Sequence, residues 1–233
     1  MKEELIRTAR LLGADALERL SHTRVAIFGV GGVGGYVAEA LARAGVGAFD
    51  LIDKDRVSLS NINRQIIALH STVGRPKVET AKERILDINP DACVAAHEVF
   101  FLPESAGMFD FSSYDYVVDA VDNVTAKIAL VLAARDAGVP IISSMGAGNK
   151  LDPSKFTVTD LAKTSVDPLA RVMRTELRRR GILHLKVVWS PEIPTKPTVA
   201  PDEPDPKAPG SLSFVPATAG LLLASAVVAD LIK

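Results

Sequence analysis

Two cations and a carboxylate in the first half of the chain have residue types and positions that suit phosphate chemistry. Arg64 lies in the stretch NINRQ, Lys77 follows in VGRPKVE, and Asp122 ends the apolar run YDYVVDAVD. Arginine offers a planar fork of donors and lysine a point charge, so the two suit a triphosphate whose α-phosphorus is attacked while pyrophosphate departs. Asp122 has two interpretations: it holds Mg²⁺ that bridges the phosphates, or it caps the following helix. For Arg64 the alternative is a solvated loop in which the arginine caps a helix.

A glycine-rich loop precedes these residues and predicts a nucleotide site. Gly29, Gly31 and Gly34 fit the pattern GxGxxG between an apolar strand and a helix, and Gly32 adds a fourth glycine. Without side chains, the backbone N–H groups of such a loop approach phosphates closely. Asp53 ends the next strand, where a carboxylate accepts hydrogen bonds from ribose hydroxyls. The loop fits NAD as well as ATP, or a close-packed turn without a ligand, and the additional cations favour a triphosphate.

Short apolar strands alternate with helical stretches, which predicts an α/β fold of the Rossmann type with a mostly parallel sheet and helices on both faces. Strands are expected at residues 24–30, 49–53, 93–100, 114–122, 139–148 and 184–190, with 155–162 as a candidate further strand. Helices are expected at residues 35–45, 77–89, 123–138, 167–181 and within 211–233. Ligands bind such sheets at the carboxyl ends of the strands, which is where the glycine loop and Asp122 fall.

The bulk composition restricts the class of protein. The chain has 233 residues, 48% of them hydrophobic, and a formal net charge of −1, so we expect one packed domain that contacts nucleic acid through a local patch. The single cysteine, Cys93, excludes an internal disulfide and CxxC zinc pairs, and its apolar surroundings indicate an inert core thiol rather than a nucleophile. No apolar leader follows Met1, which together with the lone cysteine indicates the cytoplasm. The apolar run 211–233 contains Pro216 and Asp230 and is expected to be a buried helix rather than a membrane span.

Residues 1–233 are expected to form a single domain in three parts. Residues 1–23 are N-terminal helices, residues 24–150 the nucleotide-binding half and residues 151–233 the substrate-side half. The loop 191–210 holds seven prolines and cannot join a central strand or a helix. It is a linker or a flap over a substrate.

Four ordered motifs resemble the adenylating enzymes related to ubiquitin-activating enzyme, a family with bacterial members in molybdopterin-synthase and thiazole biosynthesis. The motifs are GVGGVG, LIDKDRVSLSNINRQ, VGRPKVE and VDAVDN. The resemblance implies an adenylation fold and ATP-dependent adenylation of a carboxylate. The family's ATP-binding positions match Gly32, Asp53, Ser60, Asn61, Ile62, Asn63, Arg64, Lys77, Asp122 and Asn123. The resemblance also implies a homodimer in which Arg10, with Arg7 as the alternative, reaches the ATP of the partner subunit.

Other segments resemble one branch of this family, the tRNA threonylcarbamoyladenosine dehydratases. These segments are TARLLGADALERL, SSMGAGNKLDP, VTDLAKTSVDPLARVMRTELRRRGI and LKVVWSPE. The resemblance implies that the carboxylate of the modification next to the anticodon is adenylated and then attacked from within the same modification, so no enzyme thiol is needed. Arg64, Lys77 and the partner subunit's Arg10 would stabilise the transition-state charge, and Asp122 would hold Mg²⁺.

Three alternatives stay open. The nearest is adenylation of the C-terminal carboxylate of a small ubiquitin-like or sulfur-carrier protein, although the zinc cysteine pairs common in such enzymes are missing. The others are a binding module without activity, and an NAD-dependent oxidoreductase, for which no acid–base pair is evident.

The second half supplies candidate contacts for tRNA and for a cation. The positive residues concentrated there are Arg171, Arg174, Arg178, Arg179, Arg180 and Lys186. They predict phosphate contacts with tRNA, or a helix end enriched in cations for dipole reasons. The branch is also associated with a monovalent cation, Na⁺ or K⁺, for which Lys163, Thr164 and Asp167 in LAKTSVDP mark the candidate loop. Sulfur-transfer proteins are candidate partners, and no membrane partner is expected.

Overall fold

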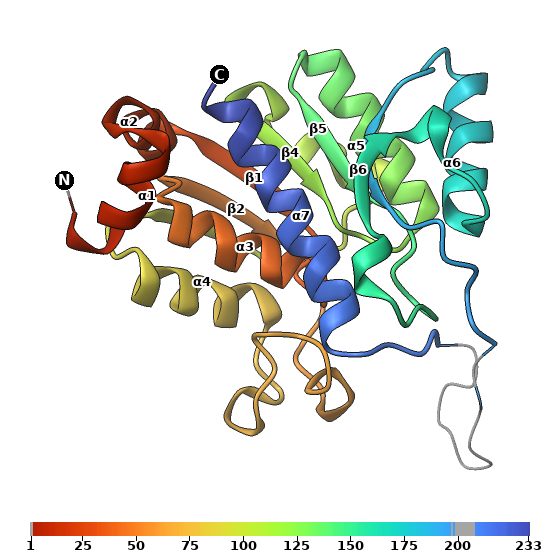
Figure 1. The fold of residues 1–233 in the computed structure, drawn as a ribbon, viewed down its shortest axis with the longest axis horizontal. Helices are drawn as coiled ribbons and strands as arrows, with labels where there is room; N and C mark the ends of the chain where they lie inside the picture. The colour runs from red at the N-terminus through yellow and green to blue at the C-terminus, as the bar shows by residue number, and fades with distance from the viewer. Residues whose placement is uncertain (1, 197, 199–207) are drawn as a thin grey trace.

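Figure 1 presents the computed structural model, which describes residues 2–196, 198 and 208–233. The strands are β1 Arg24–Phe28, β2 Ala48–Ile52, β3 Cys93–His97, β4 Tyr116–Asp119, β5 Ile141–Ser144, β6 Thr157–Asp160 and β7 Lys186–Trp189. They form one sheet in the order β3-β2-β1-β4-β5-β7-β6, in which every pairing is parallel except that of β6 with β7. The expected mostly parallel sheet is confirmed, and both halves of the chain contribute strands to it.

Helices cover both faces of this sheet. The longer ones are α1 Ile6–Leu12, α2 Ala14–His22, α3 Gly34–Ala44, α4 Lys77–Ile88, α5 Val124–Ala137, α6 Pro168–Arg179 and α7 Phe214–Leu231. Alternate residues of β1 point to opposite faces: Val25 and Ile27 join the cluster under α3, α4 and α7, whereas Ala26 and Phe28 join the cluster under α5. In Figure 1, α3 and α7 lie in front of the sheet and α5 behind it.

The order of the strands reverses beside β1, and this creates the place for a ligand. The chain runs outward from β1 through β2 to β3 and then returns to β4 on the other side of β1. Phe28 at the end of β1 is paired in register with Asp119 at the end of β4. The loops that follow these two strands therefore diverge at a topological switch point, where open α/β sheets bind ligands.

The expected C-terminal helix is confirmed as α7. By length and composition α7 is the described helix that could span a membrane, but here it packs on α3. Gly220 permits this contact, because a Cβ at that position would lie 2.4 Å from the carbonyl oxygen of Val33. The apolar character of α7 is therefore used in packing against the rest of the domain.

Two details differ from the sequence prediction. Cys93 is exposed rather than buried, because it begins the edge strand β3, which pairs only with β2. The expected strand 114–122 ends at Asp119, so Asp122 lies in the loop beyond it. Residues 197 and 199–207 of the expected proline-rich loop lie outside the described residues.

Candidate functional site

Two glycines give the loop between β1 and α3 its shape. Gly29 has φ +88°, and a Cβ there would lie 2.7 Å from the carbonyl oxygen of Ala120 beyond β4. A Cβ on Gly34 would lie 1.8 Å from the carbonyl oxygen of Gly29. Neither position tolerates a side chain, so these glycines bring the loops after β1 and β4 into contact.

Gly31 and Gly32 lie on the open part of this loop. The nearest atom to a Cβ on Gly31 would be Nε2 of Gln65, at 3.7 Å, and a Cβ on Gly32 would lie 3.5 Å from Cγ of Arg64. Gln65 is buried, and its Oε1 has no hydrogen-bond partner among the described residues. An unpaired buried polar atom costs about 1–3 kcal/mol. A ligand that presents an N–H or O–H donor beside the glycine loop would supply the missing partner, so this oxygen fits the base or ribose of a nucleotide rather than its phosphates.

Asp53 links the glycine loop to the segment after β2. Its Oδ2 accepts a hydrogen bond from the backbone N–H of Val30 at 2.8 Å, and its Oδ1 accepts one from the N–H of Asp55 at 2.8 Å. Both bonds leave lone pairs on the carboxylate. Asp53 therefore positions the loop and retains acceptors for hydroxyl groups.

The NINRQ stretch forms a turn whose polar groups hold one another. Oδ1 of Asn61 accepts a hydrogen bond from the N–H of Ser58 at 3.1 Å. Nη1 of Arg64 donates to the carbonyl oxygen of Ser60 at 2.8 Å and to Oδ1 of Asn63 at 2.9 Å. A guanidinium has five N–H donors, so Arg64 is oriented by one nitrogen and keeps the others for a ligand.

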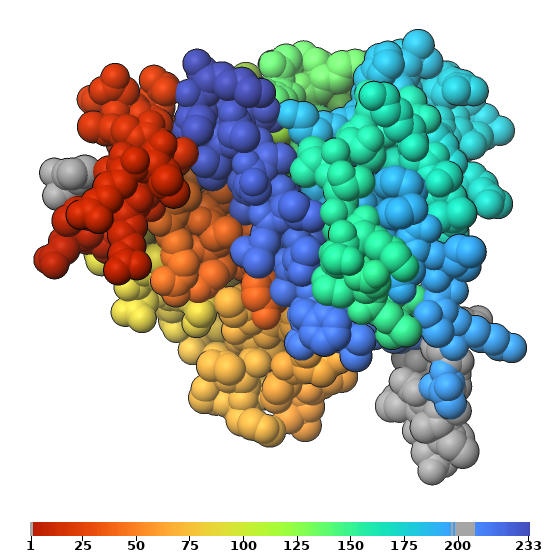
Figure 2. Space-filling view, viewed as in Figure 1, coloured from red at the N-terminus to blue at the C-terminus, as the bar shows by residue number. Residues whose placement is uncertain are grey.

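The whole segment between β2 and α4 protrudes from the body of the molecule, as Figure 2 shows. Ile62 anchors it by packing against the main core cluster. Nδ2 of Asn63 donates to the carbonyl oxygen of Ser211, just before α7, at 3.1 Å. The turn is thus fixed to both the core and the C-terminal part of the chain.

Lys77 is the first residue of α4 and is 5% exposed. Its ammonium donates to Oδ2 of Asp55 at 2.9 Å, and the side chain of Asp55 is 52% exposed. This partner was not foreseen from the sequence. A buried cation with an exposed counter-charge can exchange that counter-charge for an anion from solution, such as a phosphate.

Asp122 lies exposed in the loop between β4 and α5, and no hydrogen bond or ion pair joins it to another residue within the described ranges. The cap of α5 is Asn123, whose Oδ1 accepts from the N–H of Ala126 at 2.9 Å. The interpretation of Asp122 as the helix cap is therefore wrong. Its carboxylate faces solvent beside the switch point.

A fully buried charge cluster lies beneath this loop. Nζ of Lys127 donates to both carboxylate oxygens of Asp119 at 3.0 Å and to Oγ of Ser143 at 3.2 Å, and all three side chains are inaccessible to solvent. Oδ1 of Asp119 also accepts from the N–H of Val121 at 3.2 Å, while Ser143 donates to Oδ2. The cluster holds the start of the loop that carries Asp122.

The sequence matches the ThiF family over residues 4–230, nearly the whole chain. The chain belongs to the ThiF family. The family resemblance inferred from the four motifs is therefore confirmed.

Individual relatives match along the whole length. The tRNA threonylcarbamoyladenosine dehydratase of Bacillus subtilis is 44% identical, over 100% of this chain and 96% of the relative. The crystal structure of E. coli tRNA N6-threonylcarbamoyladenosine dehydratase in complex with ATP has a TM-score of 0.90 and 37% identity, over 99% of this chain and 94% of that chain. The AMP complex of the same enzyme has a TM-score of 0.89 and 38% identity, over 97% and 92% of the two chains.

The cations in the second half of this ThiF-family chain are not equally available. Arg179 and Arg180 both pair with Glu176, at 2.7 Å, and these bonds lower the pKa of Glu176. Arg171 and Arg178 are exposed on α6 and have no ion pair with any residue of the described part. Arg174 and Lys186 are engaged elsewhere, with Thr164 and Asp230 respectively.

The N-terminal arginines lie on a different part of the molecule. Arg10 and Arg7 are exposed on α1, which packs beside α2 at one end of the molecule (Figure 1). No hydrogen bond or ion pair joins either arginine to the glycine loop within the described chain. The structure of one protomer thus does not bring Arg10 to the other site residues.

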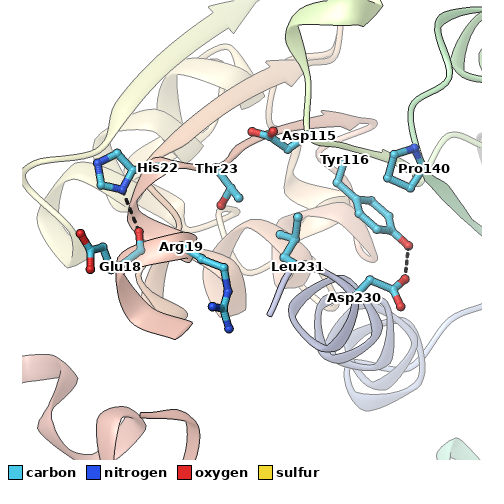
Figure 3. A pocket seen from close by; sticks show the side chains of 9 residues that line it. All are labelled: Glu18, Arg19, His22, Thr23, Asp115, Tyr116, Pro140, Asp230 and Leu231. Atoms are coloured by element: carbon cyan, nitrogen blue, oxygen red, sulfur yellow. Dashed lines mark hydrogen bonds between the residues drawn. The ribbon is translucent and has the colours of Figure 1, made fainter. Parts of the chain in front are cut away.

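A cavity of about 560 Å³ lies at the other end of the strands, where β1, β4 and β5 begin (Figure 3). There Tyr116 donates its hydroxyl to Asp230 at 2.8 Å, and burial followed by this bond raises the pKa of Tyr116. Nη2 of Arg19 donates to the carbonyl oxygen of Ile232. These groups are satisfied by one another and attach the end of α7 to the sheet, so we assign the cavity a structural role.

Proposed function

We propose that this protein adenylates the carboxylate of threonylcarbamoyladenosine in tRNA, next to the anticodon, with ATP, and so drives its dehydration to the cyclic form. The observation that carries the proposal is the 44% identity to the Bacillus subtilis dehydratase over the whole chain, including the substrate-side half. The likeness of the fold to the ATP-bound E. coli dehydratase supports ATP as the co-substrate. We propose that it acts in the cytoplasm.

ATP would lie across the switch point. The glycine loop would receive the phosphates through its N–H groups, with Gly31 and Gly32 allowing close approach. Asp53 would accept from the ribose, and Ser60, Asn61, Ile62 and Asn63 would form the turn that presents Arg64. Gln65 is an addition to this set, because its unpaired amide oxygen is buried beside the loop.

Arg64 and Lys77 would stabilise the charge that develops during adenylation. A carboxylate oxygen of the modification attacks the α-phosphorus, the bond to the bridging oxygen breaks and pyrophosphate leaves. Attack from within the same modification then displaces AMP, and the modified nucleoside has lost one water. The ammonium of Lys77 would leave Asp55 for a phosphate oxygen, and no enzyme thiol takes part.

Mg²⁺ fits Asp122 as a single-carboxylate site. The described residues contain no group of three or more His, Cys, Asp or Glu side chains able to hold a metal ion. Mg²⁺ in nucleotide sites is usually held by one or two carboxylates together with substrate phosphates, and Asp122 is exposed beside the glycine loop. The metal would neutralise phosphate charge, and Asn123 would keep Asp122 in place by capping α5.

The enzyme is proposed to act as a homodimer in which Arg10 completes the site of the partner subunit. Arg10 is exposed on α1, and no hydrogen bond or ion pair joins it to its own site within the described chain, as this arrangement requires. Mixing Arg10→Ala with Asp122→Ala tests it: each variant alone is inactive, but random exchange restores about a quarter of the activity, because half of the dimers then contain one intact site. Absence of restoration, with exchange verified by mass spectrometry, contradicts action across the dimer.

The tRNA is proposed to contact the free arginines of α6. Arg171→Ala with Arg178→Ala should weaken tRNA binding and reduce the salt slope of binding by about one to two units. The matched control is Arg179→Ala with Arg180→Ala, because both arginines are already paired with Glu176. If the two double variants weaken tRNA binding equally, α6 contributes only its total charge, and the proposed distinction between free and paired arginines is wrong.

The decisive experiment compares substrates. We expect pyrophosphate release from ATP when tRNA carrying threonylcarbamoyladenosine is added, and a modified nucleoside lighter by one water. A second reaction contains a small sulfur-carrier protein in place of the tRNA. Pyrophosphate release that depends on this protein and not on tRNA would overturn the proposal. A sulfur-transfer protein is a further candidate partner, on the ground that the family includes enzymes of sulfur-carrier pathways.

A further inference from the structure

A buried ammonium group lies at the loop where a monovalent cation was expected. Nζ of Lys150 donates to the carbonyl oxygen of Gly146 at 2.6 Å, to Oδ2 of Asp167 at 3.0 Å and to the carbonyl oxygen of Ser190 at 3.3 Å. The side chains of Lys150 and Asp167 are each 1% exposed. An ammonium has three N–H donors, so these three oxygens satisfy it completely.

The oxygens around Lys150 are those that a small monovalent cation would take. Backbone carbonyls and a carboxylate replace the hydration shell of such ions in proteins. They come from three separate segments: Gly146 follows β5, Asp167 caps α6 and Ser190 follows β7. A Cβ on Gly146 would lie 2.7 Å from Oδ2 of Asp167, so glycine at this position permits the close approach.

Of the three residues expected to mark the cation site, Thr164 and Asp167 are already engaged. Oγ1 of Thr164 donates to the carbonyl oxygen of Leu161 at 2.7 Å and accepts from Arg174. Oδ1 of Asp167 accepts from the N–H of Ala170 at 2.8 Å and so caps α6. Lys163 is exposed. These residues therefore do not fit a Na⁺ or K⁺ ion in addition to Lys150.

The backbone beside the oxygen atoms that surround Lys150 is held in an unfavourable conformation. Val166 has φ +49°, which is rare and strained for a β-branched residue. The carbonyl oxygen of Ser165 accepts from the N–H of Asp167 at 2.5 Å and from Nε1 of Trp189 at 3.0 Å. The turn is held by the bond from the N–H of Asp167 to Ser165 and by the bond from Lys150 to the carboxylate of Asp167. Removing Lys150 would therefore release the turn.

We propose that the ammonium of Lys150 takes the place of a bound monovalent cation, neutralising Asp167 and joining the ends of β5 and β7 to α6. The protein is then independent of Na⁺ and K⁺, and removal of Lys150 makes it dependent on them. The proposal concerns the folded chain and does not rest on the substrate. Its primary readout is therefore thermal stability rather than activity.

The test compares wild type with Lys150→Gln, which removes the charge and offers an amide oxygen as a ligand. Both are unfolded thermally in choline chloride and in KCl at the same ionic strength. Wild type should show the same Tm in both salts. Lys150→Gln should lose about 10 °C in choline chloride, because Asp167 is left as an unpaired buried charge, and should regain at least half of the loss in KCl.

Three controls separate the outcomes. Lys155→Gln removes an exposed lysine paired with Asp152 at 3.4 Å, and its Tm should change little in either salt. Lys150→Met fills the space without a ligand oxygen and should be rescued less than Lys150→Gln. If Lys150→Gln does not fold, the pair Lys150→Gln with Asp167→Asn removes both charges; that protein should fold and show no preference for KCl. A wild type that requires K⁺, or a Lys150→Gln protein equally unstable in both salts, would overturn the proposal.

Discussion

Replacing Lys127 by methionine tests how the charge cluster under the Asp122 loop works. Lys127, Asp119 and Ser143 are inaccessible to solvent, and the carboxylate of Asp119 accepts two bonds from the ammonium at 3.0 Å. Methionine fills a similar volume but leaves the carboxylate as an unpaired buried charge. Removing one partner of a buried pair costs about 3–5 kcal/mol. For a domain of this size that corresponds to a decrease in Tm of roughly 6–20 °C.

The double variant Lys127→Met with Asp119→Asn separates charge from packing. Both buried charges are gone, while Oδ1 of Asn at position 119 can still accept from the N–H of Val121. We expect the double variant to recover more than half of the stability that Lys127→Met loses. Because either single change leaves an unpaired buried charge and costs about 3–5 kcal/mol, the two single costs together should exceed that of the double variant by at least about 4 kcal/mol. Its adenylation rate should stay within about tenfold of wild type, since the bond that starts the loop is kept.

Urea unfolding gives the stability of the wild type, both single variants and the double variant, and ATP-dependent pyrophosphate release gives the rate. The matched control is Ser143→Ala, which removes the bond accepted from Lys127 and the bond donated to Asp119 and should cost about 2 kcal/mol. A cost below about 1 kcal/mol for Lys127→Met, or effects of the two single changes that simply add, would refute the account of a coupled buried pair.

Three further predictions follow from single groups. Asp122→Asn should lower adenylation at least about 100-fold with no change in Tm, because the exposed side chain makes no bond within the described chain. Asn123→Ala should cost about 1 kcal/mol in urea unfolding, because it removes the cap of α5. Partial burial raises the pKa of Asp230, but hydrogen bonds from Lys186 and Tyr116 outweigh it and lower the pKa to about 2. The resulting stability, about 1 kcal/mol after solvent screening, is present above about pH 4 and lost as the pH falls towards 2, and Asp230→Asn should remove that acid dependence.

Local patterns predicted the strands, the helix ends and the positions of the loops. Gly45 closes α3 with φ +93°, as its place after an apolar helix suggested. Parallel strands carry their following loops to one edge, so the glycine loop and Asp122 could be assigned to the same side of the sheet before any contact was known. These features depend on residues that are close in the sequence.

Long-range partners could not be predicted in this way. Lys127 appears in the sequence as one of many helical lysines, and only the register of β4 with β5 places Asp119 beside Ser143 and under that lysine. Cys93 was misassigned for a related reason: an apolar strand gives no sign of whether it will lie at the edge of the sheet. Gln65 was visible at the end of NINRQ, but its buried, unpaired oxygen depends on the packing of the glycine loop.

The buried lysines of the described chain all lie at the carboxyl edge of the sheet, but they differ in how exposed their partner aspartates are. Each pairs with an aspartate at the carboxyl edge of the sheet: Lys77 with Asp55, Lys127 with Asp119, and Lys150 with Asp167. Replacing a buried ion pair by apolar residues of similar size is often neutral or stabilising, so stability alone does not explain these three pairs. Their shared place at the carboxyl edge is better explained by the way they fix the loops that begin there. The aspartates of the last two pairs are 0% and 1% exposed, whereas Asp55 is 52% exposed. Lys127 and Lys150 are therefore held permanently in place, and of the three Lys77 is the one whose ammonium can leave its carboxylate for a phosphate.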